Sequence, residues 1–391
     1  MSQPATASEN APRALTSLTD EERLFRQSVG EFATSQLRPL AAEMDEQGKF
    51  SADLIKQFFD LGLMGIAIPE QYGGQGGNFF TSIIAVEELS RADASAGVIV
   101  DVQNTLVNNA LLMWANEDQK RRYLPRLATD TVGAYALSEA GSGSDAFALA
   151  TKAEDKGDHY LLNGAKMWIS NSPKADVAVV WAKNEAGRIH GLILERGMAG
   201  FSTPETHGKW SLRASTTGEL VFDNVKVPKE NLLPGKSGLG APLMCLDSAR
   251  YGIAWGALGA AMDCYDSARR YAMERIQFGK PIASFQLMQK KLAEMLTEIT
   301  KAQLLNWRLG VLMNEGKATT PQISMAKRNS VQTALEIARE ARQIHGGMGI
   351  TGEYPIMRHM MNLESVMTYE GTHDIHLLIL GNEITGISAF V

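Results

Sequence analysis

The chain has 391 residues, of which 45% are hydrophobic and 21% are charged, and this favours a globular protein with about two or three domains. Its formal net charge of -6 argues against nucleic acid as the main partner, because nucleic-acid-binding surfaces are basic. No apolar run reaches the length of a membrane span, so we expect no membrane partner.

The first third of the chain has the periodicity of helices. Residues 1–17 are polar, rich in Ala, Ser and Pro, and lack a signal peptide, so we interpret them as a disordered tail of a cytoplasmic protein. Thr19-Asp20-Glu21-Glu22 is a capping box that begins the first helix, and Pro39 is its expected end. The predicted helices cover residues 19–39, 51–62, 79–89, 94–114 and 118–127, which makes 18–130 a helical domain.

From residue 131 to residue 235 the apolar residues come in short or alternating runs separated by turns. This pattern favours a compact antiparallel β domain. Asn163-Gly164 lies between two such runs and predicts a hairpin turn. Further strands are expected over residues 177–181, 191–194 and 219–227.

Helical periodicity returns at residue 239 and is maintained to the end, in a domain of residues 236–391. The predicted helices cover residues 239–272, 285–313, 321–344 and 375–387, and their length favours an antiparallel bundle. Cys245 and Cys264 both fall in the first of these helices, far from a CxxC spacing. We interpret them as core residues of a protein in a reducing compartment, and we expect no metal site.

Glu370 stands out near the C-terminus because it lies between the ring of Tyr369 and the glycine Gly371, just before the last predicted helix. A carboxylate beside a ring and a chain reversal can lose part of its hydration, which raises its pKa toward that of a useful base. The alternative is that Glu370 occupies the first turn of the helix, where the helix dipole favours acids. Local sequence leaves both interpretations open.

Three further stretches are rich in small residues. Residues 137–145, Leu-Ser-Glu-Ala-Gly-Ser-Gly-Ser-Asp, could bring backbone N–H groups and hydroxyls close to a flavin ring or a phosphate, or could form a turn-rich loop. Residues 275–279, Arg-Ile-Gln-Phe-Gly, and residues 343–349, Gln-Ile-His-Gly-Gly-Met-Gly, raise the same question, because glycine also ends helices.

Taken in this order, these motifs make the chain resemble the acyl-CoA dehydrogenase family from about Leu18 to the C-terminus. The resemblance implies an α+β fold with an N-terminal helical domain, a central antiparallel β domain and a C-terminal four-helix bundle. It also implies FAD bound between the β and C-terminal parts, and a homotetramer built as a dimer of dimers. In such a tetramer the stretch at residues 275–279 of one subunit reaches the cofactor of its neighbour.

The resemblance also implies roles for individual residues. Glu370 would be the catalytic base, and a flavin-dependent oxidoreductase would pass its electrons to an electron-transfer flavoprotein. The cofactor-binding residues would be Leu137, Ser138, Gly143, Ser144, Trp168, Ile169, Ser170, Arg275, Phe278, Gln286, Gln343, Gly346, Gly347, Thr372 and Asp374. The substrate-binding residues would be Gly97, Ser144, Arg250, Tyr369 and Gly371. The alternatives are a surface position for Arg275 and Arg250 and a core position for Trp168.

The two halves of the chain resemble different relatives. Residues 93–106 and 145–149 are similar to short/branched-chain acyl-CoA dehydrogenases, whereas residues 209–215, 249–256 and 370–375 are similar to glutaryl-CoA dehydrogenase. Alignment of residues 88–98 places Gly97 and Ser90 where glutaryl-CoA dehydrogenases carry an arginine and an acid. Gly97 and Val98 would instead leave room for an uncharged chain.

We therefore expect α,β-dehydrogenation of a short-chain acyl-CoA, straight or branched, to the trans-2-enoyl-CoA. The alternatives are oxidative decarboxylation of glutaryl-CoA to crotonyl-CoA, another reaction on an activated carbon, and a catalytically silent scaffold of the same fold.

Overall fold

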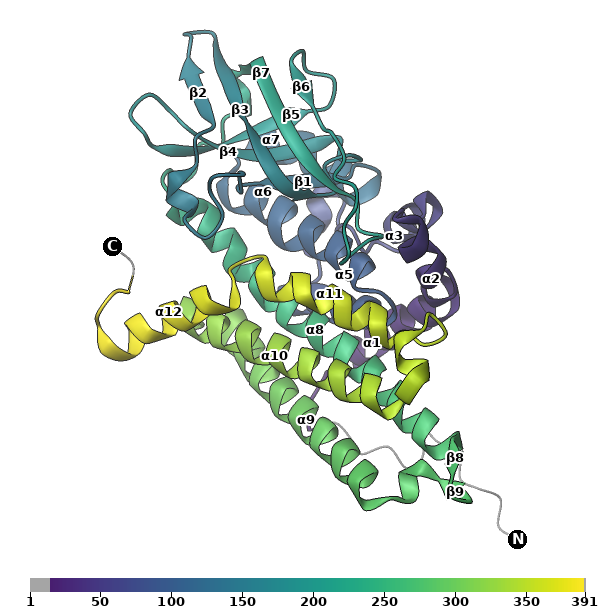
Figure 1. Cartoon of the computed structure of the whole chain (residues 1–391). Coiled ribbons are helices and arrows are strands. Elements are labelled where there is room, and N and C mark those ends of the chain that lie inside the picture. Colours follow the sequence, from purple (N-terminus) through teal and green to yellow (C-terminus); the bar gives the residue numbers. More distant parts are fainter. Residues whose placement is uncertain (1–14, 390–391) are drawn as a thin grey trace.

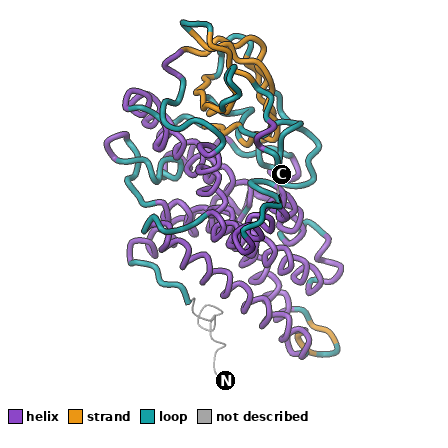
Figure 2. Tube along the Cα trace, turned by 90° about the vertical axis from the view of Figure 1, so that its left-hand side faces the viewer, coloured by secondary structure: helices purple, strands orange, loops and turns teal. Residues whose placement is uncertain are grey.

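The structure is a computed structural model that describes residues 15–389. Residues 1–14 of the tail predicted at 1–17 therefore lie outside the described residues. Figure 1 shows a β layer at one end of an elongated molecule, with helices forming the rest. Figure 2, a side view, shows the main sheet confined to this end, with only a small pair of strands at the other. The predicted fold class of helical domain, β domain and helical bundle is confirmed. Over residues 15–389, every helix is too short or too polar to cross a membrane.

The N-terminal domain begins with the predicted capping box. Thr19 Oγ1 accepts from Glu22 N at 3.1 Å, Thr19 N donates to the Glu22 carboxylate at 2.8 Å, and α1 (Asp20–Phe32) follows. Pro39 does not end this helix as expected. A π-helical turn (Ala33–Leu37) precedes α2 (Arg38–Gln47), and this wide turn accommodates a proline ring that would clash in a regular α-helix.

The remaining helices of this domain surround an apolar core. They are α3 (Ala52–Asp60), α4 (Phe79–Ala92), α5 (Ala94–Asp101), α6 (Asn109–Trp114) and α7 (Glu117–Thr129), with a π-helical segment (Val102–Asn108) between α5 and α6. Every residue of α5 is buried, which places this helix in the centre of the molecule.

The main sheet has seven strands. They are β1 (Gly133–Ala136), β2 (Lys152–Asp155), β3 (His159–Ser170), β4 (Val177–Lys183), β5 (Ile189–Glu195), β6 (Phe201–Ser202) and β7 (Thr217–Pro228). Their order is β1-β4-β2-β3-β7-β6, with β5 paired to β4. Most pairs are antiparallel as predicted, but β4 runs parallel to both β1 and β2, so the sheet is mixed.

The hairpin turn predicted at Asn163-Gly164 is wrong. Both residues lie inside β3, where a β-bulge shifts the register against β7 between Leu162 and Gly164. A Cβ on Gly164 would lie 2.6 Å from Thr151 Oγ1, so the glycine is required by close strand packing and not by a turn. The chain reverses instead at Gly157, which has φ of +93° between β2 and β3.

The C-terminal domain is a bundle of long helices, as predicted, but it contains one helix that the sequence did not predict. They are α8 (Gly240–Glu274), α9 (Gln286–Asn314), α10 (Thr320–Ile344), α11 (Ile356–Thr368) and α12 (His373–Thr385), with a small hairpin of β8 (Ile276–Gln277) and β9 (Lys280–Pro281) after α8. The sequence did not predict α11, whose buried face includes the polar residues His359 and Asn362. This helix completes the bundle, whereas α12 extends away from the body in Figure 1.

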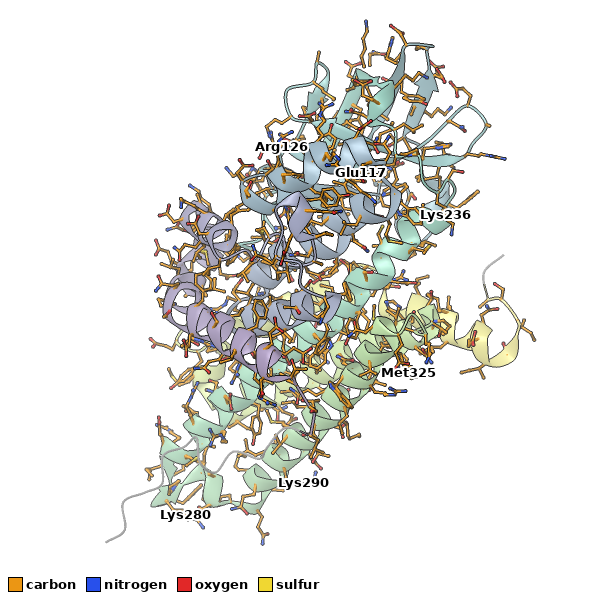
Figure 3. All side chains as sticks on the ribbon, turned by 180° about the vertical axis from the view of Figure 1, so that it is seen from behind. Glu117, Arg126, Lys236, Lys280, Lys290 and Met325 are labelled. Atoms are coloured by element: carbon orange, nitrogen blue, oxygen red, sulfur yellow. The ribbon has the colours of Figure 1, made fainter. Side chains whose placement is uncertain are left out.

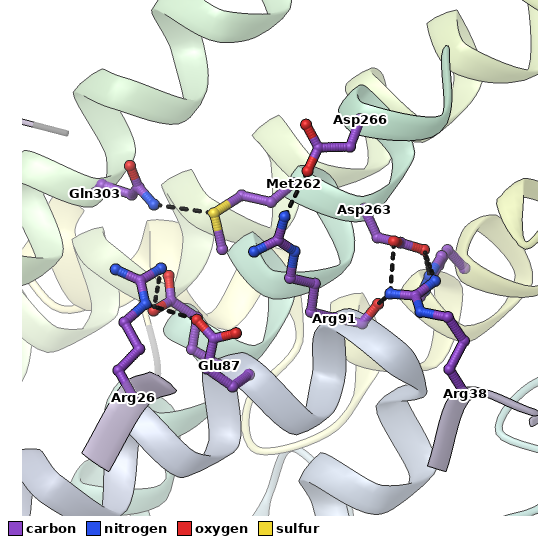
Figure 4. A network of polar contacts seen from close by, with 10 residues as sticks. Arg26, Arg38, Glu87, Arg91, Met262, Asp263, Asp266 and Gln303 are labelled. Atoms are coloured by element: carbon purple, nitrogen blue, oxygen red, sulfur yellow. Dashed lines mark hydrogen bonds and ion pairs between the residues drawn. The ribbon is translucent and has the colours of Figure 1, made fainter. Parts of the chain in front are cut away.

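Ion pairs hold the middle of α8 against the helices around it (Figure 4). Asp263 accepts from Arg38 of α2 at 2.8 Å and from His359 Nε2 of α11 at 3.0 Å, and Asp266 pairs with Arg91 of α4 at 2.5 Å. We call these five residues the α8 brace. The predicted core positions of Cys245 and Cys264 are confirmed, because both thiols are buried along the same helix.

Candidate active site

Glu370 lies in the short connection between α11 and α12, where the bundle approaches the β layer (Figure 1). Its φ of +55° is unusual for a residue with a side chain. The next helix begins only at His373, with Thr372 Oγ1 accepting from Ile375 N at 3.2 Å as its N-cap. Glu370 is therefore outside the helix, and the alternative of a first-turn helix acid is wrong.

Two buried cations hold the backbone on both sides of Glu370. Lys327 of α10 donates from Nζ to Tyr369 O at 2.9 Å and to Gly371 O at 2.8 Å. Arg250 of α8 donates from Nε to Glu370 O at 2.9 Å. Arg250 is 6% exposed, so the alternative of a helix-surface arginine is wrong as well.

The Glu370 carboxylate has chemistry that suits a general base. Its Oε2 is buried and has no hydrogen-bond partner among the described residues. Burial raises the pKa of Glu370 to about 7, although the charges of Lys327 and Arg250 act in the opposite direction. A carboxylate with a pKa close to neutrality is both available and basic enough to take a proton from a weak carbon acid.

Sequence reasoning missed Lys327 and two further ionisable neighbours of this carboxylate. Asp101, the last residue of α5, is fully buried, and neither of its carboxyl oxygens has a hydrogen-bond partner among the described residues. Burial and then the charge of Glu370 raise the pKa of Asp101 well above its usual value, which disfavours its charged form. The only local signal was an acid at the end of an otherwise apolar helix.

His376 is the second neighbour, on the first turn of α12. It is fully buried, and burial lowers its pKa to about 3. A Cβ on Gly371 would lie 2.9 Å from His376 Nε2, so Gly371 allows the loop to pass close to this neutral ring.

The loop predicted to meet a flavin begins at the end of β1 and folds back on itself. Glu139 and Ser142 exchange backbone hydrogen bonds of 3.0 and 3.1 Å, and buried Lys166 donates to Leu137 O at 3.0 Å and to Glu139 Oε1 at 2.8 Å. The far side of this loop is open. Ser144 is exposed, Ser138 is half-buried, and a Cβ on Gly143 would have no neighbour within 4 Å.

Trp168 lies beside this loop on β3, where Met167 N donates to Ser138 O at 2.9 Å. It has φ of +63° and is 58% exposed, at a second shift of register between β3 and β7. The core position considered for Trp168 is therefore wrong, whereas Ile169 is buried and Ser170 is half-buried. An exposed indole beside a loop with free polar groups fits a flat aromatic cofactor with a polar rim.

A second group of predicted cofactor residues lies elsewhere. Arg275, Phe278 and Gln286 are exposed around the β8–β9 hairpin, and Phe278 is 93% exposed. Lys280 marks this hairpin in Figure 3, at the opposite end of the molecule from Glu117 and Arg126. Within one chain these residues therefore do not meet Trp168.

The other predicted positions lie near the C-terminal end of α8 or at the start of α12. Gln343 accepts from Lys291 Nζ at 3.0 Å, and Gly346 and Gly347 are open, near the C-terminal end of α8, where Tyr271 stacks on His345. Thr372 serves as a helix cap, and Asp374 is exposed on the first turn of α12.

The room expected at Gly97 is not there. A Cβ on Gly97 would lie 1.9 Å from Ser90 Oγ, so the serine side chain fills this space. Val98 lies in the apolar cluster that also contains Leu137, and Tyr369 packs against the same cluster.

Family models match nearly the whole chain in the order of its domains. The model of the acyl-CoA dehydrogenase N-terminal domain matches residues 19–131, that of the middle domain residues 134–225, and that of the C-terminal domain residues 236–385.

Relatives with different named substrates resemble the chain to similar degrees. It is 38% identical over 379 residues to the mitochondrial short/branched chain specific acyl-CoA dehydrogenase of Bos taurus, covering 95% of this chain and 88% of that protein. Two crystal structures of glutaryl-CoA dehydrogenase from Mycobacterium smegmatis, the second with FADH2, have TM-scores of 0.93 and identities of 43% and 42%. Both alignments cover 96% of this chain and 97% of the other. Butyryl-CoA dehydrogenase from Megasphaera elsdenii has a TM-score of 0.91 and 36% identity, over 94% of this chain and 99% of the other.

Proposed function

Because the chain belongs to the acyl-CoA dehydrogenase family, whose members are FAD-dependent oxidoreductases, we propose that it oxidises a short-chain acyl-CoA to the trans-2-enoyl-CoA. The acyl chain would be straight or α-methyl-branched. The observation that carries the proposal is the unpaired, partly buried carboxylate of Glu370, whose pKa of about 7 suits the removal of a proton next to a thioester.

Three parts of this chain would remove the proton, hold the flavin and line the acyl chain. Glu370 would take the α proton, and its backbone N–H would donate to the thioester oxygen, where negative charge develops. The loop at residues 137–144 and the exposed face of Trp168 would hold the flavin, which accepts the β hydride when bound. Tyr369 and Val98 would line the acyl chain.

We propose a substrate without a second carboxylate because, among residues 15–389, no free cation is shown beside Gly97 of α5. Gly97 and Ser90 pack against each other, and the neighbouring Arg91 is engaged by Asp266. Asp101 on the same helix is itself an acid without a partner. A buried carboxylate without a partner costs several kcal/mol, so a glutaryl chain would be rejected.

Glutaryl-CoA is the second candidate substrate, because the structures of glutaryl-CoA dehydrogenase share up to 43% identity with the chain. Another cation would then have to take the place of the arginine missing at residue 97. The reaction would release carbon dioxide and crotonyl-CoA, which separates the two candidates by product as well as by rate.

The test is a panel of butyryl-, isobutyryl-, 2-methylbutyryl- and glutaryl-CoA, oxidised by the purified flavoprotein with an artificial electron acceptor. We expect kcat/KM for the best monocarboxyl substrate to exceed that for glutaryl-CoA by at least ~100-fold, given the cost of an unpaired carboxylate, and no release of carbon dioxide. Preferred oxidation of glutaryl-CoA with carbon dioxide release would refute the proposed substrate. A preparation without flavin absorbance would instead favour a silent scaffold.

The proposal extends to assembly and partners. A homotetramer would bring Arg275, Phe278 and Gln286 of one subunit to the cofactor of another, which is supported by their distance from the flavin loop of their own chain. An electron-transfer flavoprotein would accept the electrons. Domain boundaries near residues 18, 131 and 236 and a cytoplasmic location stay predictions from the sequence.

A further inference from the structure

Three consecutive carbonyls, those of Tyr369, Glu370 and Gly371, all accept hydrogen bonds from buried cationic side chains. The first and third are bound by one group, the ammonium of Lys327, and the second by Arg250. The two donors come from different helices, α10 and α8. The backbone around Glu370 is thus held by hydrogen bonds, while Oε2 of its carboxylate has no partner among the described residues.

These hydrogen bonds counteract a local strain. A residue other than glycine at φ of +55° is held in a sparsely populated region that costs on the order of 1 kcal/mol or more. Without a constraint, the loop would relax and move the carboxylate. The bond of Lys327 to Tyr369 O fixes the peptide plane before Glu370, and the bond of Arg250 to Glu370 O fixes the plane after it. The second bond of Lys327, to Gly371 O, fixes the next plane along the chain.

We propose that Lys327 is a positioning residue for the base, which fixes the backbone of Glu370 in its strained conformation and favours its ionised form. This inference rests on the proposed function of Glu370. Lys327 is 1% exposed, and its ammonium donates to two backbone carbonyls and forms no ion pair among the described residues. The charge of Glu370 favours the ammonium form of Lys327, whereas that of Arg250 disfavours it.

The other ionisable groups around Glu370 do not replace this charge. Those that face it or its loop are Asp101 of α5, Tyr135 of β1, Asp247 and Arg250 of α8, Tyr369 beside it, and His373 and His376 of α12. Burial raises the pKa of Asp101 and of both tyrosines and lowers that of both histidines, which disfavours the charged form of each of these groups. Arg250 is paired with Asp247 at 2.9 Å. Burial lowers the pKa of Lys327 itself to about 7, and the charge of Glu370 opposes this shift, so Lys327 and Glu370 each favour the ionised form of the other.

The test compares Lys327→Met, which keeps the length of the side chain without its charge, with Lys327→Arg, which keeps the charge. The flavin-containing enzymes are assayed for kcat/KM with butyryl-CoA from pH 5.5 to pH 9. Loss of a nearby positive charge should move the acid limb of the Lys327→Met profile to higher pH by roughly one unit. Its kcat should fall by roughly 10- to 100-fold from misplacement of the base. Lys327→Arg should keep the limb at the wild-type pH.

A matched control is Lys209→Met. Lys209 also donates from its ammonium to backbone carbonyls, those of Leu212 and Ser215, but it belongs to a different loop. Its loss should lower stability without moving the pH limb. Should Lys327→Met not yield folded protein, Lys327→Gln removes the same charge.

A second measurement does not depend on turnover. Hydrogen–deuterium exchange of residues 369–373 in the flavin-containing enzyme should be at least ~10-fold faster in Lys327→Met than in wild type, because the constraint on the loop is lost. An acid limb at the wild-type pH, or unchanged exchange in this loop, would overturn the inference. The proposed function fails separately, if Glu370→Gln retains turnover in an otherwise wild-type chain.

Discussion

The raised pKa of Glu370 predicts a specific dependence of the rate on pH. With a pKa of about 7, the ionised fraction of this carboxyl falls from about 90% at pH 8 to about 10% at pH 6, so kcat/KM should fall about tenfold over this interval. A glutamate at the ordinary value of 4.5 would stay ionised over the same range and give a flat profile.

The perturbation that tests this assignment is Glu370→Gln, which keeps the size of the side chain but cannot accept a proton. The variant should retain its flavin and lose at least ~100-fold in kcat, with no acid limb in the remaining activity. Glu364→Gln is the matched control, because Glu364 is an exposed acid of α11 that pairs with Arg339 and should be replaceable without effect on the rate.

The assay is reduction of an artificial acceptor at saturating acceptor concentration, with the ratio of flavin to protein measured from the absorption spectrum. A flat wild-type profile from pH 5.5 to pH 8 would show that the carboxyl is not perturbed. Near-normal turnover in Glu370→Gln would remove this residue from the mechanism altogether.

The same shift affects stability. The folded chain retains a proton on Glu370 between pH 4.5 and pH 7 that the unfolded chain has released, so stability falls as pH rises through this window. A shift from 4.5 to about 7 corresponds to roughly 3 kcal/mol. In urea unfolding, wild type should lose about this much relative to Glu370→Gln between pH 4.5 and pH 7.

Two further substitutions test the proposed flavin site. Arg275→Ala should lower both flavin content and the molecular mass measured by light scattering, because a charge-assisted contact to a diphosphate would cross the subunit boundary; a fully flavinylated tetramer would contradict this. Lys166→Met should lower the ratio of flavin to protein at least ~10-fold at limiting FAD, because it removes the buried ammonium that holds Leu137 O and Glu139; the exposed turn variant Lys156→Met is its control, and equal flavin content in the two would show that this ammonium does not support the loop.

The features that were predicted correctly from the sequence are those marked by a few neighbouring residues. The capping box at Thr19 marks a helix start, and the loop around Glu370 combines a glycine with a helix cap, so both were found from a few neighbouring residues. The bulge at Gly164 was mistaken for a turn because glycine serves both purposes, and only the partner strand and Thr151 decide between them.

Lys327, Asp101 and His376 were missed for a related reason. Each lies within or at the end of a helix, and nothing near it in the sequence shows that it faces Glu370. Lys327 is 43 residues from Glu370 and Asp101 is much farther, so their roles depend on tertiary packing. The prediction of empty space at Gly97 was wrong for the same reason, because Ser90, which fills that space, belongs to another helix.

Helix α8, held by the α8 brace, connects the loop of Glu370 to the exposed β8–β9 hairpin. Arg250 of α8 lies at the loop that contains Glu370, and Arg275 directly follows the last residue of α8 at the exposed hairpin. The two are 25 residues apart, or about 37 Å along a helix. Over this lever a tilt of only ~3° would displace the hairpin by about 2 Å relative to the base. Asp263 and Asp266 anchor the lever between its two ends. Their ion pairs therefore limit how far the hairpin can move relative to the base. In the proposed homotetramer, loosening them would displace Arg275 from a neighbouring subunit without changing any contact of Glu370.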